Sequence, residues 1–230
     1  MGITSSLFAV FCTLILPICV AIYLCRLKKG LWIPTLVGAT TFFVFQILIR
    51  LPIFQLVLPN IEWYLTMSSA QPLLYALFLG ATAGLVEEFG RYITMKLMLK
   101  NNRQLIDGIA FGVGHGGIEA ILLVGINALI NLFLTSQSVV PNLMFASGVE
   151  RIVTLILHIC WSIMVMKSIR ERKPTWLFIA FITHTFIDAG AAFASIKGVS
   201  IWFIEVPLIL CALLALVFII NEYKTKEEIK

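Results

Sequence analysis

Long apolar runs separated by short polar segments dominate the pattern of the chain. Seven of these runs are long enough for a membrane-spanning helix, which needs roughly 20 mainly apolar residues. They lie at about residues 3–25, 32–58, 71–99, 105–134, 147–168, 175–195 and 199–221. The pattern therefore predicts an all-α polytopic membrane protein with about seven transmembrane helices, joined by plain connectors near 59–70 and 135–142.

Lysine and arginine gather at one set of the predicted helix ends. That side of the bundle would hold Arg26, Lys28, Lys29, Lys96, Lys100, Arg103, Lys167, Arg170, Arg172, Lys173, Lys224, Lys226 and Lys230, and the other side only Lys197. Because short cytoplasmic loops carry the excess of positive charge, we expect the N-terminus outside and the C-terminus in the cytoplasm. We expect a multi-pass protein of a cell membrane, namely the bacterial cytoplasmic membrane.

The composition narrows the function classes. Hydrophobic residues make up 60% of the 230 residues and charged residues 13%, against about 45–50% and roughly 25% in average chains. This excludes a soluble nucleic-acid-binding domain and a secreted disulfide scaffold, and it makes the lipid bilayer the expected partner. The asymmetric loops account for the net charge of +5, so no nucleic-acid partner is expected.

Ionisable side chains inside the predicted spans are the main exception to the apolar pattern. They are Arg50, Glu87, Glu88, Arg91, His115, Glu119, Glu150, Arg151, His158, His184, Asp188 and Glu205. A charged group at the centre of a bilayer costs about 2.5–3.5 kcal/mol on insertion scales, so these groups must be sheltered, paired or bound to a ligand. We expect Arg50 and Glu205 to be accommodated outside the site that the others form.

Four of these side chains fall at one depth. With a rise of about 1.5 Å per residue, each lies about 14–18 Å from the nearest basic residue or boundary on the cytoplasmic side. They are Glu88, His115, His158 and His184, on four different spans. The hydrocarbon core is about 30 Å thick, so the four spans bring carboxylate and imidazole groups to one layer near its middle.

The same residues also share helix faces, because positions four apart lie on one side of a helix. The pairs at this spacing are Glu87 with Arg91, His115 with Glu119, and His184 with Asp188, while Glu150 and Arg151 lie on the span of His158. Four polar stripes facing one another predict a buried chamber that can bind a divalent metal or polarise a water molecule.

Glycines on two spans predict close packing next to this chamber. Gly108, Gly112 and Gly116 recur every four residues on the fourth span, and Gly80 and Gly84 lie one turn from Glu87 on the third. Small residues let helix backbones approach closely. We therefore expect the third and fourth spans to touch at the site.

The sequence does not contain the residues that several classes of intramembrane hydrolase require. There is no HExxH pair for zinc and no GxSxG nucleophile turn, and Ser147 lies away from the histidine layer. An aspartyl dyad needs two facing aspartates, but Asp107 is expected at the cytoplasmic edge, far from Asp188. The five cysteines lie within spans without a CxxC pair. A glutamate and histidine site remains.

Three short motifs occur in order on separate spans: Glu87-Glu88-Phe89-Gly90-Arg91 (EExxR), Phe111 to His115 (FxxxH) and His184 to Asp188 (HxxxD). Together they resemble the motifs of the CAAX prenyl endopeptidase and bacteriocin-processing superfamily of intramembrane proteases. The run Gly-His-Gly-Gly-Ile-Glu at 114–119, with Glu150-Arg151 and His158, makes the chain most similar to the YhfC-type membrane peptidases. PrsW-type proteases are similar but more distant. The resemblance covers roughly residues 80–195.

The resemblance implies a peptide hydrolase. It implies that Glu87 or Glu88 activates a water for attack on a peptide carbonyl, with His115 as the partner of that glutamate. Adjacent carboxylates in a low dielectric do not both ionise easily, which by itself offers an acid and a base in one place.

The resemblance further implies that Arg91 orients the carboxylate pair. His184 and Asp188 would complete a metal site or stabilise the oxyanion. The chain departs from the CAAX pattern in two places, since that pattern has EExxxR and HxxxN. Arg91 comes one residue earlier here, and Asp188 adds a negative charge that strengthens the case for a bound cation.

The expected function is that of a metal-dependent intramembrane endopeptidase acting on a membrane protein or peptide. The expected ligands of a divalent metal, with zinc preferred, are Glu87, His115, His158 and His184, supported by Glu119, Glu150 and Arg151. We expect residues 1–230 to form a single membrane domain, with the catalytic core at about 71–195 and peripheral helices at 3–25, 32–58 and 199–221.

Two other functions stay open at this point. Carboxylate and histidine chains in membranes also serve as relays in proton- or cation-coupled transporters. No inverted repeat is visible in the sequence, and 230 residues in seven spans would be small for a transporter. A catalytically inactive membrane scaffold that retains an old site is the other alternative.

Overall fold

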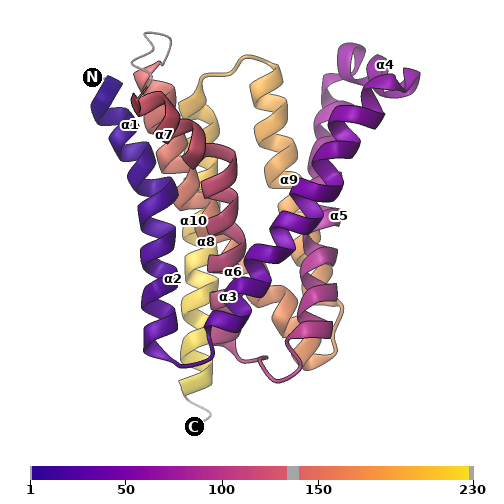
Figure 1. Ribbon diagram of the computed structural model, residues 1–230. Helices are drawn as coiled ribbons and strands as arrows, with labels where there is room; N and C mark the ends of the chain where they lie inside the picture. Colours follow the sequence, from indigo (N-terminus) through magenta and orange to yellow (C-terminus); the bar gives the residue numbers. More distant parts are fainter. Residues whose placement is uncertain (1, 134–139, 228–230) are drawn as a thin grey trace.

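The computed structural model describes residues 2–133 and 140–227, and every regular element within them is a helix (Figure 1). The elements are α1 (Gly2–Val10), η1 (Phe11–Ile15), α2 (Leu16–Leu27), α3 (Trp32–Phe42), η2 (Phe43–Arg50), η3 (Ile53–Val57), η4 (Leu58–Asn60), α4 (Glu62–Ala70), α5 (Pro72–Met98), α6 (Leu105–Glu119), η5 (Ala120–Gly125), α7 (Ile126–Phe133), α8 (Pro141–Glu171), α9 (Thr175–Ile196) and α10 (Ile201–Glu227). The η4 element is a 3₁₀ turn, and the other η elements are wide π-helical segments within longer helices.

Seven helical stretches in the described part of the chain are long and apolar enough to cross a membrane. They are Ile3–Leu27, Trp32–Asn60, Pro72–Met98, Leu105–Phe133, Pro141–Glu171, Thr175–Ile196 and Ile201–Thr225. The predicted fold class and number of spans are confirmed. The first and last described residues lie at opposite ends of the bundle (Figure 1), as an odd number of spans requires. Which end faces the cytoplasm stays a prediction.

The fifth span is longer than the predicted 147–168. It begins at Pro141, whose fixed φ suits the first helical position. It ends at Glu171, where Arg172 adopts a left-handed conformation with a φ of 55°. The first and last turns of this span contain polar residues, so a search for apolar runs did not include them.

The prediction of a plain connector near 59–70 was wrong, because Glu62–Ala70 forms the helix α4. Aromatic packing holds α4 in place: Tyr64 lies edge-on to Phe54 and Phe78, with ring centroids 6.2 and 6.0 Å apart. Most of the connector predicted at 135–142 lies outside the described residues.

Glycines position the helices around the site, but with other partners than expected. A Cβ added to Gly84 of α5 would lie 2.7 Å from Thr185 Oγ1 of α9, and one added to Gly112 of α6 would lie 2.5 Å from the Cα of Ile159 in α8. On the other face of α6, Gly114 lies directly against the Thr35 carbonyl of α3. The third and fourth spans do touch at the site, where His115 Nε2 lies 3.0 Å from Glu87 Oε2, but not through these glycines. Instead α5 packs on α9, and α6 packs between α3 and α8.

Candidate metal centre

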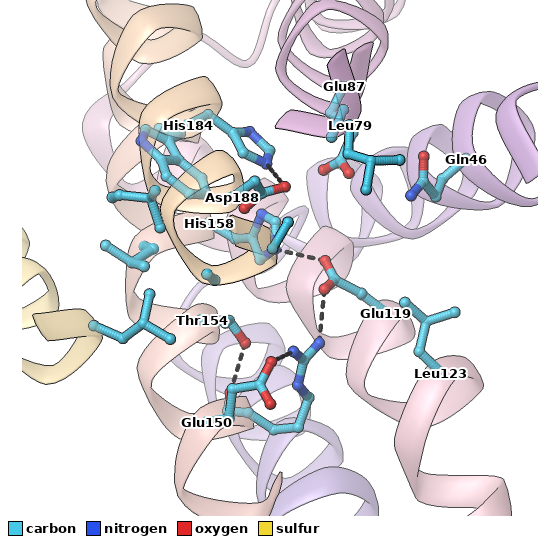
Figure 2. A pocket seen from close by; sticks show the side chains of 18 of the residues that line it. Gln46, Leu79, Glu87, Glu119, Leu123, Glu150, Thr154, His158, His184 and Asp188 are labelled. Atoms are coloured by element: carbon cyan, nitrogen blue, oxygen red, sulfur yellow. Dashed lines mark hydrogen bonds and ion pairs between the residues drawn. The ribbon is translucent and has the colours of Figure 1, made fainter. Parts of the chain in front are cut away.

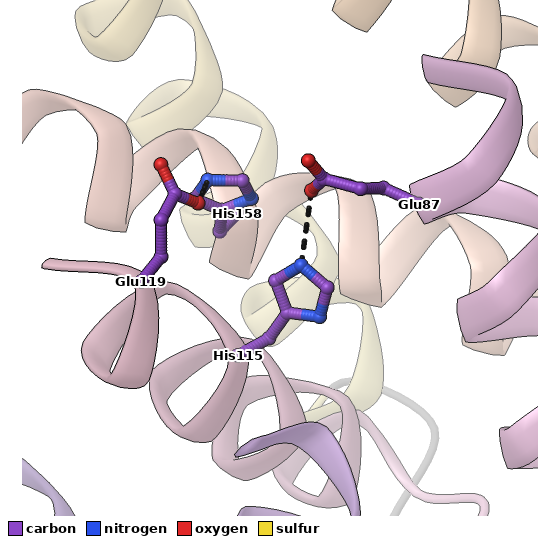
Figure 3. A group of neighbouring side chains, drawn as sticks. All are labelled: Glu87, His115, Glu119 and His158. Carbon is purple, nitrogen blue, oxygen red and sulfur yellow. Dashed lines mark hydrogen bonds and ion pairs between the residues drawn. The ribbon is translucent and has the colours of Figure 1, made fainter. Parts of the chain in front are cut away.

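Four buried side chains from three helices converge near the middle of the bundle (Figure 3). They are Glu87 of α5, His115 and Glu119 of α6, and His158 of α8, and one ligand atom from each lies within 4.8 Å of the others. Because His115 and Glu119 are four residues apart, one face of α6 presents both. α5 and α6, which do not pack closely on each other, meet here through side chains.

The contacts within this group involve atoms that can bind a metal. His115 Nε2 lies 3.0 Å from Glu87 Oε2, and His158 Nε2 lies 2.5 Å from Glu119 Oε2. Within the described part of the chain, Glu119 Oε2 nevertheless has no hydrogen bond of good geometry, and buried His115 Nδ1 has no hydrogen-bond partner. Buried polar atoms without partners are costly, so the group has unused capacity to bind a ligand.

Arg91 lies directly behind this group and is fully buried. Its Nη1 donates to Glu88 Oε1, and its Nη2 donates to Glu87 Oε2 at 3.3 Å and to His158 Nδ1 at 2.6 Å. The i, i+3 and i, i+4 spacings along α5 place both carboxylates within reach of one guanidinium. Arg91 thus links the glutamate pair to the histidine of α8.

His184 of α9 lies beside this group rather than in it. Its Nδ1 lies 2.7 Å from Glu88 Oε1, its Nε2 lies 3.4 Å from Asp188 Oδ2, and its ring stacks on Trp161 with centroids 4.0 Å apart. With a carboxylate at each ring nitrogen, the doubly protonated imidazolium satisfies both contacts. An imidazolium has no lone pair for a metal.

Arg151 holds the outer side of the group. Its Nη1 donates to Glu119 Oε1 at 2.7 Å, and its Nη2 donates to Glu150. One oxygen of Glu119 is therefore held by a guanidinium, while the other faces His158. This pairing fixes the Glu119 carboxylate, as charge-assisted hydrogen bonds do.

All the sequence-predicted site residues belong to one network of ion pairs and hydrogen bonds. Its charged members are Glu87, Glu88, Glu119, Glu150, Asp188, Arg91, Arg151 and His184. With every carboxylate ionised, five carboxylates face two guanidinium groups and one imidazolium in the network, and the Arg50 guanidinium lines the same cavity. The formal balance is negative by one charge. Uncompensated negative charge is expensive inside a membrane, and a divalent cation would offset it.

A cavity of about 340 Å³ opens onto this network (Figure 2). Polar residues that line it include Gln46, Arg50, Glu87, Glu119, Glu150, Arg151, Thr154, His158, His184 and Asp188. Glu88 does not line the cavity and is 0% exposed, whereas the side chain of Asp188 is 41% exposed. Of the adjacent glutamates, only Glu87 reaches the space where a substrate could lie.

Two cavity residues were missed by the sequence analysis. Arg50 was expected outside the site, but it lines the cavity, donating to Leu79 O at 2.9 Å and stacking on Phe54 at 4.5 Å. Gln46 is 8% exposed, and its Oε1 has no hydrogen-bond partner among the residues that the structure describes. The available signal was their spacing of four residues, which places both on one helix face.

The chain is similar in sequence to known membrane proteins. The sequence model of the family described as "YhfC intramembrane metalloprotease" matches residues 12–142 and 129–208. A curated relative, "Uncharacterized membrane protein YhfC" of Bacillus subtilis (strain 168), is 29% identical over 183 residues, which cover 67% of this chain and 70% of the relative. No solved structure matches.

Proposed function

The chain belongs to the YhfC intramembrane metalloprotease family, and from this premise and the geometry of its buried site we propose that it is a metal-dependent intramembrane endopeptidase. The observation that carries the proposal is the convergence of two carboxylates and two imidazoles within a network that carries an excess of negative charge. The expected substrate is a membrane protein or peptide, cleaved in a bacterial cytoplasmic membrane.

The proposed ligands are Glu87, His115, Glu119 and His158, with Glu119 in place of the His184 suggested by the sequence. Two imidazoles and two carboxylates suit a first-row dication, and zinc is the ion we propose. When His158 Nε2 binds a metal, its ring proton must lie on Nδ1. Arg91 would then give up its contact with that nitrogen and keep its bond to Glu88.

A dication at these ligands would polarise a peptide carbonyl and lower the pKa of a bound water toward neutrality. The chain's own residues would handle the proton and the developing charge. Asp188 has a partly exposed carboxylate in the cavity and can accept a proton from water. The Nε2–H of His184, whose 3.4 Å contact with Asp188 is the longer of its two contacts, could donate to an oxyanion in place of that carboxylate.

The two adjacent glutamates would have different roles. Glu87 faces the cavity and would be a ligand, so it is the member of the pair that acts on the reacting atoms. Glu88 accepts from both Arg91 and His184 out of reach of the cavity. It would position those two cations, as groups behind a metal site commonly do.

The test is cleavage of labelled transmembrane peptides by purified protein in proteoliposomes. Wild-type protein should cleave at least one peptide, a chelator should stop cleavage, and zinc should restore it. His115→Ala and Asp188→Asn should each lower kcat by at least about a hundredfold. Glu62→Gln, which removes a carboxylate from α4 outside the site, should retain activity.

Full activity of a Glu87→Gln, His115→Ala double variant would overturn the proposal. Ion flux through the proteoliposomes without any cleavage would favour a transporter instead.

A further inference from the structure

A second cavity, of about 520 Å³, lies where α5 and α8 end and α9 begins. The end of α5 and the start of α9 lie at the end of the bundle near the last described residue, away from α4 (Figure 1). The basic and aromatic residues that line the cavity are Phe89, Tyr92, Lys96, Arg103, Arg172 and Phe178. None of them belongs to the candidate metal centre.

The charge of this cavity is unbalanced. Lys96, Arg103 and Arg172 line it, no carboxylate does, and none of the three forms an ion pair with a described residue. Glu171 precedes Arg172 but lies within 4.0 Å of Arg170 and Lys173 instead. Three positive charges therefore face one space without an anion to neutralise them.

The backbone adds to this positive potential. α9 begins at Thr175, next to cavity-lining Pro174, and no side chain caps its first turn. Free amides at a helix N-terminus attract anions. Ser168, which is 3% exposed, also lines the cavity and adds a hydroxyl group to it. Cationic side chains, free amides and a hydroxyl form the set of groups that binds a phosphate.

Apolar walls extend the cavity toward the lipid. Phe89 and Tyr92 lie on α5, and Phe178 of α9 is 50% exposed on the flank of a membrane span. Lys96 lies 5.2 Å from the centre of the Tyr92 ring, so cationic and aromatic groups share one wall. A ligand that fits carries a negative headgroup at the end of the span and an acyl chain along it.

We propose that this cavity binds the phosphate headgroup of an anionic phospholipid. Such lipids attract basic residues at the ends of spans, and a pocket between helices selects a headgroup where an open surface does not. The site is independent of the proposed protease activity. A lipid held there would bridge α5 and α9, the helices that carry Glu88 and His184.

A glycine substitution at Arg172 tests lipid binding in a variant that is expected to stay folded. Its φ of 55° is a conformation that glycine adopts without strain at the end of a helix. Arg172→Gly should therefore leave the melting temperature unchanged or raise it while weakening lipid binding.

The experiment measures binding of fluorescent phosphatidylglycerol to the purified protein in neutral detergent. Unlabelled phosphatidylglycerol, phosphatidylcholine and inorganic phosphate serve as competitors. The triple variant Lys96→Gln, Arg103→Gln, Arg172→Gln is compared with Lys29→Gln, Lys100→Gln, Lys224→Gln, which removes equal charge outside the cavity. The first should lose about tenfold or more in affinity and the second no more than about twofold.

Equal losses in the two triple variants would overturn the proposal, because binding would then follow surface charge alone. Competition by phosphatidylcholine as strong as that by phosphatidylglycerol would overturn the selectivity for an anionic headgroup. Competition by inorganic phosphate at the same concentrations would assign the site to free phosphate rather than lipid. Unchanged affinity in Arg172→Gly would remove Arg172 from the site and contradict the inference.

Discussion

The contacts of individual side chains in the middle of the bundle indicate which of them can bind a metal. Glu119 presents one oxygen to Arg151 and the other to His158, while both nitrogens of His184 face carboxylates. A metal needs a free lone pair on each ligand, which Glu119 offers and an imidazolium does not. The fourth ligand should therefore come from α6 rather than from α9.

Glu119→Gln and His184→Gln separate these two assignments. We expect Glu119→Gln to weaken metal affinity by well over a hundredfold, since it removes a ligand. His184→Gln should weaken it by about 10–100-fold at most, the effect typical of a group behind the ligands. Competition with a fluorescent chelator measures both affinities, and the reverse order would restore His184 as the ligand.

Arg91 is a separate case, because its removal leaves charges buried without a partner. Arg91→Ala should lower the free energy of unfolding by about 3–5 kcal/mol, as loss of one member of a buried ion pair does. Arg26→Ala, which removes an exposed arginine that forms no ion pair with any described residue, is the control and should have little effect. Thermal unfolding in detergent measures both, and equal melting temperatures for the two variants would contradict the account.

The sequence predicted the membership of this cluster better than its internal geometry. Helical rise and spacing were enough to bring Glu88, His115, His158 and His184 to one layer. They could not choose between Glu119 and His184, because that choice depends on how α6 and α9 are rotated about their axes. Arg50 was misplaced for the same reason: hydropathy gives its depth but not the direction in which it points.

At the scale of helices, glycines decide which pairs touch. Gly114 lies against the carbonyl of Thr35 and so holds α6 against α3, whereas nothing lies within 4 Å of a Cβ added to Gly190 of α9. The sequence showed where small residues recur but not which helix each glycine faces. This is why the third and fourth spans meet at the site through Glu87 and His115, as expected, but not through the glycines that were expected to bring them together.

Alanine at these two glycines should have opposite effects. Gly114→Ala should destabilise the protein by about 1–3 kcal/mol, because the methyl group has no space against backbone. Gly190→Ala should be neutral or stabilising by up to about 1 kcal/mol, since alanine favours a helix. Melting temperatures of the two variants provide the comparison, and similar losses in both would show that the α3–α6 contact is not tight.

At the scale of the whole molecule, the bundle has two differently charged ends. The basic residues at the ends of α2, α5 and α8 predict a cytoplasmic face there, because translocation of lysine and arginine is disfavoured. The proposed lipid cavity would then lie on the cytoplasmic side.

Reporter fusions test this orientation. Green fluorescent protein fused after the last residue should fluoresce in a bacterial host, and alkaline phosphatase at the same position should be inactive. Alkaline phosphatase inserted after Ala70, at the end of α4, should be active. An active phosphatase at the C-terminus would reverse the topology.

The central claim is that the buried glutamate and histidine group holds one divalent metal, and elemental analysis of purified protein tests it most directly. Wild-type protein prepared without chelators should contain close to one equivalent of metal per chain, and a His115→Ala, His158→Ala variant that remains folded should contain none. A folded wild-type protein that takes up no metal when zinc is supplied, or a double variant that keeps its full equivalent, would contradict the account.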